Sequence, residues 1–496
     1  MFPQCPRYRG GNEDGLIVPH GMRETLLLRH LGFKVPSPVM YYDYAGGKPF
    51  DVQRKTVEML AENPRAYVLN AMGTGKTKSA LWAWDFLRKQ GLLRKLLVVA
   101  PLSTLTFVWA REVFGTLPGV TVQILHGSRQ ERLDRLAKDA DIYVINHDGV
   151  KVIADSLLTR PDIDCLVLDE LAVYRNNSDR SKKMRKFAQK FSVVWGLSGA
   201  PMPNSPVDVW AQGMIVTPNT VPKYQSHARD LLMLRISNFV WKPKPNAVEM
   251  AFSMLKPAVR YTLDDVIELP DTIERTVDVD LTSQQKKVYE RVKNELAAMV
   301  ADKQITALNA GVAMGKMLQV AGGWVYTQNP EFVRLDASNR IATVIDFIQS
   351  AEHKVIVYIP YRHMIEGLAG IFDRLKVGFD YAIVHGDTKD REHIFNAFQN
   401  TDKYHALLAH PGTIKHGLTL TAADTIIWYI PIASLEVFEQ ANARITRVGQ
   451  KHKQQVIMLQ STPVEKRLYS LLRTKQKLQD KLLTLVEEAT HKPAEV

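Results

Sequence analysis

Residues 66–84 read AYVLNAMGTGKTKSALWAW, and this stretch decides the fold that we expect. A short apolar run leads into a glycine-containing loop and then into an apolar, helix-forming segment. Glycines let backbone N–H groups turn inward around a phosphate, and the start of the helix presents its positive end. The lysine of such a loop reaches the β- and γ-phosphate oxygens, and the hydroxyl after it binds Mg²⁺. The stretch therefore predicts a nucleotide site formed by Met72, Gly73, Thr74, Gly75, Lys76 and Thr77.

A second element of the same half supports this prediction. Residues 166–168 form an apolar run that ends in two acids, Asp169 and Glu170. Asp169 suits the Mg²⁺ shell, and Glu170 suits the base that orients and activates water. Acids at a strand end can also simply mark the turn to solvent, but the phosphate loop upstream favours the catalytic interpretation. Residues 197–201, LSGAP, end the next strand and are expected to sense the γ-phosphate.

Short β-rich runs alternate with helical stretches in two halves of the chain, which predicts parallel sheets and an α/β fold. Lys242-Pro243-Lys244-Pro245 is expected to be a linker, because two close prolines do not fit inside a helix. The expected parts are an accessory segment (1–48), an ATP-binding lobe (49–240), a linker and helical region (241–325), a second lobe (326–463) and a C-terminal helix (464–496). The strand candidates are 66–70, 95–101, 141–146, 165–170, 193–199, 354–360, 381–386, 405–411 and 425–431.

Composition limits the classes of function. The 496 residues are 46% hydrophobic and 23% charged, which is typical of a globular protein of two or three domains. The formal charge of +12 favours a polyanionic partner. Two cysteines exclude a disulfide framework and suit a reducing compartment. No apolar run has signal-peptide or membrane-spanning character, so we expect a soluble, cytoplasmic protein without a membrane partner.

Two arginines stand three residues apart near the end of the second half, within QANARITRVGQ (440–450). At this spacing Arg444 and Arg447 can point into one cleft. A guanidinium supplied from a second domain stabilises the charge that spreads over the γ-phosphate oxygens during transfer. Without this context, two surface arginines in contact with water would be the simpler interpretation.

The ordered set of motifs resembles the superfamily-2 helicases and, within them, the Swi/Snf-type ATPases, especially the compact bacterial, phage and annealing-helicase-like members. The resemblance covers roughly residues 50–460 and is most specific at GLTLTAAD (417–424) and at QANARITRVGQ. It implies two RecA-like lobes with ATP and Mg²⁺ between them, and it assigns adenine recognition to Gln53. It also implies nucleic acid, most of all double-stranded DNA, across the tops of the lobes. The expected nucleic-acid contacts are Ser103, Thr104, Trp109, Arg362, His385, Thr413, Lys415 and His416.

The chain departs from the family pattern at five places. Asn70 replaces the first glycine of the strict phosphate loop, and Ala172 stands where a histidine usually follows the two acids. Ala200 replaces a threonine, Ile414-Lys415 replaces a glycine pair, and Ala443 replaces a glycine. None of these changes removes a phosphate or metal ligand. They affect the coupling between hydrolysis and movement.

Three interpretations of function follow. The first is an ATP-dependent motor that tracks along duplex DNA and remodels the duplex or proteins bound to it, in a bacterial or phage-infected cell. The second is a strand-separating DNA or RNA helicase, against which we find no dedicated wedge hairpin in the sequence. The third is a nucleotide-controlled DNA clamp with little turnover, against which Lys76, Asp169, Glu170 and Arg447 argue. The sequence identifies no protein partner.

Overall fold

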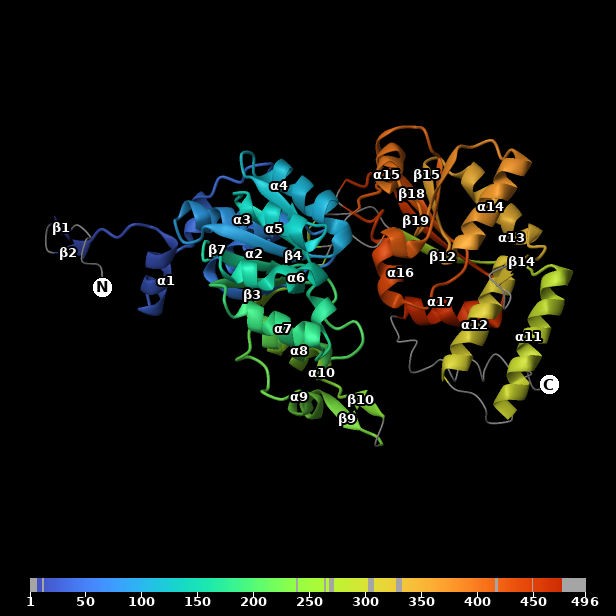
Figure 1. Ribbon diagram of the computed structural model, residues 1–496, viewed down its shortest axis with the longest axis horizontal. Coiled ribbons are helices and arrows are strands. Elements are labelled where there is room, and N and C mark those ends of the chain that lie inside the picture. Colours follow the sequence, from blue (N-terminus) through green and yellow to red (C-terminus); the bar gives the residue numbers. More distant parts are fainter. Residues whose placement is uncertain are drawn as a thin grey trace. The chain divides into compact units, whose positions relative to one another are not determined.

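The structure is a computed structural model that describes residues 7–10, 13–237, 240–262, 265–266, 272–301, 307–326, 332–414, 418–447 and 449–474. The chain divides into two units, Met1–Ile267 and Glu268–Val496, each with its own parallel sheet (Figure 1). This division lies later in the chain than the predicted end of the first lobe at residue 240. The predicted α/β class is confirmed in both units.

The first unit is built on a seven-stranded parallel sheet with the strand order β11-β3-β8-β7-β4-β6-β5. All five strand candidates of this half are present, and two further strands, β5 and β11, extend the edges. Successive residues of a strand face opposite sides, as in β3, where Ala66 and Val68 join one buried cluster and Tyr67 joins another. The strands are β3 (Arg65–Val68), β4 (Lys95–Ala100), β5 (Val122–Leu125), β6 (Ile142–Asn146), β7 (Ile163–Leu168), β8 (Val193–Leu197) and β11 (Ala258–Val259).

Helices cover both faces of this sheet. One face carries α2 (Asp51–Glu62) and α3 (Lys76–Lys89), and the other carries α6 (His147–Leu158), α7 (Asp179–Ala188) and α8 (Asp208–Val216). Burial on both faces explains why the strands are almost continuously apolar. The remaining elements between the strands are η2 (Leu102–Thr104), η3 (Leu105–Ala110, a π-helix), α4 (Arg111–Thr116), α5 (Arg129–Ala137) and η4 (Leu171–Tyr174).

The predicted linker at residues 242–245 is wrong, because this segment belongs to a hairpin of the first unit. Strand β9 (Met233–Arg235) pairs antiparallel with β10 (Trp241–Pro243), so Pro243 sits at a strand edge where its missing N–H is tolerated. The hairpin lies with α9 (Gln225–Leu232) and α10 (Ala247–Met254) at one end of the unit (Figure 1). A protruding hairpin was not expected from the sequence.

The segment before the first lobe has structure of its own. A hairpin of β1 (Arg7–Gly10) and β2 (Glu13–Leu16) precedes α1 (Met22–His30) and the short helix η1 (Pro38–Tyr41). The chain after η1 then crosses α3: the Tyr42 hydroxyl donates to Asp85 at 2.7 Å, and the Trp82 indole donates to the Ala45 carbonyl at 2.9 Å. The accessory segment is therefore attached to the helix that follows the phosphate loop.

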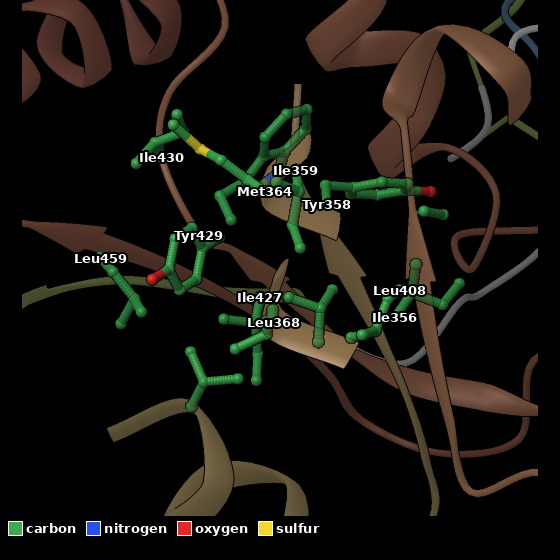
Figure 2. Packing of buried hydrophobic residues seen from close by; sticks show 14 of the residues in the cluster. Ile356, Tyr358, Ile359, Met364, Leu368, Leu408, Ile427, Tyr429, Ile430 and Leu459 are labelled. Carbon is green, nitrogen blue, oxygen red and sulfur yellow. The ribbon is translucent and has the colours of Figure 1, made fainter. Parts of the chain in front are cut away.

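The second unit is built on a six-stranded parallel sheet with the strand order β12-β19-β18-β15-β17-β16. Figure 2 shows Ile356, Tyr358, Leu408 and Ile427 packed in its core, which Met364 and Leu368 of α14 cover. The four strand candidates are present, and β12 and β19 form an additional edge. The strands are β12 (Thr272–Asp278), β15 (Lys354–Tyr358), β16 (Tyr381–Val384), β17 (Ala406–Ala409), β18 (Ala423–Trp428) and β19 (Gln454–Gln460).

The helical prediction for 284–320 is confirmed by α11 (Ser283–Ala301) and α12 (Ala307–Gly322), which lie side by side (Figure 1). The predicted C-terminal helix begins as α17 (Pro463–Arg473), with Leu468 and Leu472 buried, and residues from 475 onward lie outside the described part. The other elements are β13 (Trp324–Tyr326), β14 (Phe332–Arg334), α13 (Ser338–Ser350), α14 (Arg362–Leu375), α15 (Arg391–Asn400), η5 (Pro411–Ile414) and α16 (Leu435–Asn442).

Candidate ATP site and nucleic-acid face

The phosphate loop joins β3 to the first turn of α3, as predicted. Gly73 and Gly75 have φ angles of +83° and +79°, a backbone conformation that favours glycine. A side chain at Gly75 would also collide with Gln53, whose Nε2 lies 2.1 Å from the position of the missing Cβ. Gln53 is buried beside the loop, and its Oε1 accepts a hydrogen bond from the Phe50 N–H at 2.9 Å. The adenine-recognition candidate therefore packs directly on the phosphate loop.

Asn70 takes over the position of the missing glycine with a structural role that the sequence did not reveal. Its Oδ1 accepts from the Tyr261 N–H at 3.0 Å, and its Nδ2 donates to the Thr56 hydroxyl at 3.3 Å. The Lys76 ammonium donates to the carbonyls of Asn70 and Ala71 at 2.8 and 3.0 Å. The substitution thus leaves the loop closed around its lysine and ties it to the chain after β11.

The two acids follow β7 and lie in the same unit as the loop. The Asp169 N–H donates to the Val99 carbonyl at 2.8 Å, which fixes the backbone against β4. Its Oδ2 accepts from the Trp109 indole at 2.9 Å, and its Oδ1 accepts from the Glu170 N–H at 3.0 Å. Desolvation raises the pKa of the Asp169 carboxyl, while the Trp109 hydrogen bond and the charge of Lys76 lower it.

Glu170 has a backbone conformation that is rare for its residue type. Its φ and ψ are +50° and +53°, in the left-handed region, where a side chain costs on the order of 1–3 kcal/mol. Such a conformation persists only where the surrounding structure enforces it. Here η4 begins directly after Glu170 and buries Leu171 and Tyr174. The turn that presents the proposed base is therefore held by the packing of the residues after it.

The LSGAP element lies against the phosphate loop, as expected of a γ-phosphate sensor. A Cβ at Gly199 would lie 3.4 Å from Cγ of Met72 and 3.7 Å from Nζ of Lys76. Ser198 is buried, and its Oγ has no hydrogen-bond partner among the described residues. A buried hydroxyl without a partner, next in sequence to a glycine that lies against the phosphate loop, fits a site that takes a phosphate.

Mg²⁺ usually binds through one or two protein oxygens together with nucleotide phosphates. In the described ranges no group of three or more His, Cys, Asp or Glu side chains is placed to hold a metal ion. The hydroxyl of Thr77 and the carboxylate of Asp169 are of the type that Mg²⁺ prefers. They fit a cation that arrives with ATP.

The two arginines of the second unit differ in exposure. Arg444 is 1% exposed, and its guanidinium donates to the carbonyls of Gln440 and Leu418 at 2.9 and 3.2 Å. Arg447 is half-buried and donates to the Ala443 carbonyl at 3.0 Å and to the Thr419 hydroxyl at 3.3 Å. Desolvation and the charge of Arg444 lower the pKa of Arg447 to about 9. Of the two, Arg447 is the more exposed.

The structure corrects two of the predicted nucleic-acid contacts in the first unit. Trp109 is 0% exposed and donates to Asp169, so it cannot contact nucleic acid. Thr104 is buried, and its N–H and hydroxyl both donate to the Pro101 carbonyl, at 2.9 and 2.8 Å. Both residues shape the segment after β4. Ser103 is exposed on the turn just before Thr104 and stays a predicted contact.

The candidates of the second unit lie after its strands or at helix starts. Arg362 opens α14 and forms ion pairs with Glu366 and Asp387. His385 follows β16, is mostly buried, and accepts from the Asp387 N–H at 3.3 Å. Thr413 lies in η5 and donates to the His410 carbonyl at 2.7 Å. Lys415 and His416 lie outside the described residues.

Comparison with known families identifies the chain. The family model of the SNF2-related domain matches residues 54–321, and that of the helicase conserved C-terminal domain matches residues 339–449. The chain belongs to the SNF2-related family. The resemblance to Swi/Snf-type members of superfamily 2 is thereby confirmed, and the matched ranges cover most of each α/β unit.

Relatives of this SNF2-related chain include phage, bacterial and plant proteins. It is 24% identical to putative protein p41 of Acyrthosiphon pisum secondary endosymbiont phage 1, over 80% of this chain and 88% of that protein. It is 25% identical to an uncharacterized ATP-dependent helicase of Mycoplasma pneumoniae, over 88% of this chain and 42% of the relative. It is 23% identical to the ATP-dependent DNA helicase DDM1 of Arabidopsis thaliana, over 81% of this chain and 58% of that protein. The chain thus spans about half the length of the two larger relatives.

Proposed function

We propose that this chain is an ATP-dependent DNA motor that hydrolyses ATP when bound to DNA, tracks along the duplex, and remodels the duplex or proteins bound to it. The observation that carries the proposal is the arrangement in the first unit. The phosphate loop with its lysine, the paired acids after β7 and the LSGAP element meet around Lys76, whose charge acts on Asp169. The helicase C-terminal domain matched in the second unit supports a motor over a simple nucleotide-binding protein.

We propose the roles within the first unit from its residue types and from the family resemblance. The N–H groups of residues 73–77 surround the β-phosphate, and Lys76 exchanges its two carbonyl partners for phosphate oxygens. Gln53 binds adenine. Thr77 and Asp169 would hold Mg²⁺, which would neutralise phosphate charge when bound with ATP. Glu170 accepts the proton of the attacking water.

From the second unit we propose that Arg447 stabilises the charge of the transferring phosphoryl group. Its greater exposure favours it over Arg444, whose guanidinium donates to two backbone carbonyls inside the unit. We propose that Arg444 stabilises the turn after α16 that contains Arg447. Both residues belong to the catalytic set that we infer, with different tasks.

DNA is the polyanionic partner that the net charge of +12 favours. The name of the Arabidopsis relative, a DNA helicase, supports DNA over RNA as the partner. In the first unit Ser103 and the exposed lysines of α7 (Lys182, Lys183 and Lys186) are the proposed phosphate contacts. In the second unit they are Arg362, His385, Thr413, Lys415 and His416. The phage relative supports a bacterial or phage-infected cell, where we place the protein in the cytoplasm. No helix among the described residues is long and apolar enough to cross a membrane.

Strand separation is the second candidate function, and one observation favours it. The β9–β10 hairpin carries exposed apolar side chains at Ile236 and Val240, beside Arg235 and Lys242. Apolar side chains can wedge between base steps, and neighbouring cations can bind the phosphates. Duplex tracking and strand separation differ in their products, which allows a direct test.

The proposed function is tested by the ATPase rate without nucleic acid and with double-stranded DNA, single-stranded DNA or RNA. We expect the largest stimulation with double-stranded DNA, because the proposed motor tracks along the duplex. A rate that no nucleic acid changes would contradict a motor. Stimulation by RNA alone would contradict the choice of DNA.

A further inference from the structure

The segment between β4 and α4 holds Asp169 at both of its ends. At the first end the Val99 carbonyl accepts from the Asp169 N–H at 2.8 Å. At the other end the Trp109 indole N–H donates to Asp169 Oδ2 at 2.9 Å. The register of the sheet fixes the first contact, since Val99 pairs with Leu168. The segment 99–109 is therefore hydrogen-bonded to Asp169 at both of its ends.

The middle of this segment faces solvent. Leu102 is 56% exposed and Ser103 is exposed, whereas Leu105 and Trp109 are buried. We place a DNA phosphate on the turn at 102–104. The exposed centre of the segment would then contact DNA, while its buried ends contact Asp169. A displacement of the turn would reach Asp169 through both attachments.

The end that carries Trp109 is a π-helix, Leu105–Ala110. Helices of this kind are rare and are often found at functional sites. The wider turn explains why sequence spacing did not predict the burial of Trp109. The indole N–H is the donor that satisfies Oδ2, and Oδ1 already accepts from the Glu170 N–H. Phenylalanine at position 109 would fill most of the volume but would leave Oδ2 without this donor.

We infer that Trp109 is a positioning residue through which DNA on the 102–104 turn sets the orientation of the Asp169 carboxylate, so that DNA binding and Mg²⁺·ATP hydrolysis are coupled. The inference rests on the proposed function, because it requires DNA to occupy this turn. Trp109 itself contacts neither DNA nor nucleotide. Its indole transmits the position of the turn to the carboxylate that binds the cation.

The test compares Trp109→Phe with Trp84→Phe in the full chain. Trp84 is a matched control, since it is buried in the same hydrophobic cluster and its indole nitrogen has no hydrogen-bond partner among the described residues. The two variants lose a similar volume from the core, and only Trp109→Phe removes the donor to Asp169. For both variants we measure the melting temperature, the affinity for duplex DNA without nucleotide, and the ATPase rate as a function of Mg²⁺ concentration.

For Trp109→Phe we expect DNA affinity within about twofold of the parent and a DNA-stimulated kcat lower by on the order of ten- to a hundredfold, the range of a lost hydrogen bond to a charged group. The Mg²⁺ concentration for half-maximal rate should rise. Trp84→Phe should keep the parental ratio of stimulated to basal rate. The inference is overturned if Trp109→Phe keeps that ratio, if both variants lose it equally, or if DNA affinity falls as much as the rate.

Hydrogen exchange of the parent protein covers the case in which Trp109→Phe does not fold. Duplex DNA should slow hydrogen exchange in residues 99–110 and also at the amides of Asp169 and Glu170. The Asp169 N–H donates to the Val99 carbonyl, and the Glu170 N–H donates to the Asp169 carboxylate. Protection of 99–104 without any change at 169–170 would overturn the coupling. A parent enzyme that DNA does not stimulate would instead reject the proposed function, and the coupling with it.

Discussion

Two side chains of the first unit, Lys76 and Glu170, are expected to separate ATP binding from hydrolysis. Lys76→Ala should abolish turnover, because it deletes the cation that grips the β- and γ-phosphates. Glu170→Gln should bind ATP with parental affinity and hydrolyse it at least a hundredfold more slowly, since it keeps the shape and removes the base. Nucleotide binding by fluorescence titration and single-turnover hydrolysis measure the two steps. Parental hydrolysis by Glu170→Gln would show that another group activates water.

Arg444 and Arg447 should respond differently to removal. Arg447→Ala should lower kcat by on the order of a thousandfold, as arginine fingers do, with nearly unchanged melting temperature and DNA affinity. Arg444→Ala should lower the melting temperature as well, because the guanidinium is buried and its loss leaves the carbonyls of Gln440 and Leu418 without a donor. Kinetics and thermal unfolding of both variants give the comparison. Full activity of Arg447→Ala would mean that this residue does not complete the site.

Much of the candidate site could be predicted residue by residue, because phosphate loops and paired acids combine residue type with fixed spacing. Trp109 and Thr104 could not be placed correctly, since their burial depends on a π-helix and a tight turn that no periodicity reveals. The role of Asn70 was equally hidden, because its partner Tyr261 lies far away in the sequence.

At the scale of elements, strands were predictable where the sheet buries both of their faces. Strand β12 was missed, since TIERTVD is polar and almost wholly exposed at a sheet edge. Strand β11 has two residues, too few for a pattern. The Lys-Pro-Lys-Pro stretch was misread as a linker because proline excludes a helix but tolerates an edge strand. Sequence patterns thus described most strands of both sheets, including the edge strand β16, but missed the edge strands β5, β11 and β12 and the buried inner strand β19.

The first turn of α17 contains a buried ion pair, whose contribution to stability can be tested by unfolding. Nη2 of Arg340 on α13 lies 2.8 Å from Oε1 of Glu465, and both side chains are almost fully buried. Glu465→Gln leaves a buried guanidinium without its counter-charge, which should cost about 3 kcal/mol. The urea midpoint of the second unit's transition is the measurement. Asp278→Asn, which breaks the exposed pair with Lys466, is the control and should shift the midpoint little. Equal shifts would contradict a structural role for the buried pair.

At the scale of the whole molecule, the two units carry different parts of the proposed machine. The first holds the phosphate loop and the acids, and the second holds Arg447 and the helicase C-terminal domain. The net positive charge and the absence of predicted base contacts suggest binding that depends little on sequence. DNA-stimulated activity should therefore weaken steeply with salt, because each neutralised phosphate releases counterions.

Movement along duplex DNA is the central claim, and triplex displacement tests it most directly. A third strand annealed to a duplex is released only when a motor travels along the duplex beneath it. We predict ATP-dependent release by the parent protein, none by Glu170→Gln, and little product from a forked duplex under the same conditions. Strong unwinding of the fork without triplex displacement would contradict duplex tracking and establish strand separation instead.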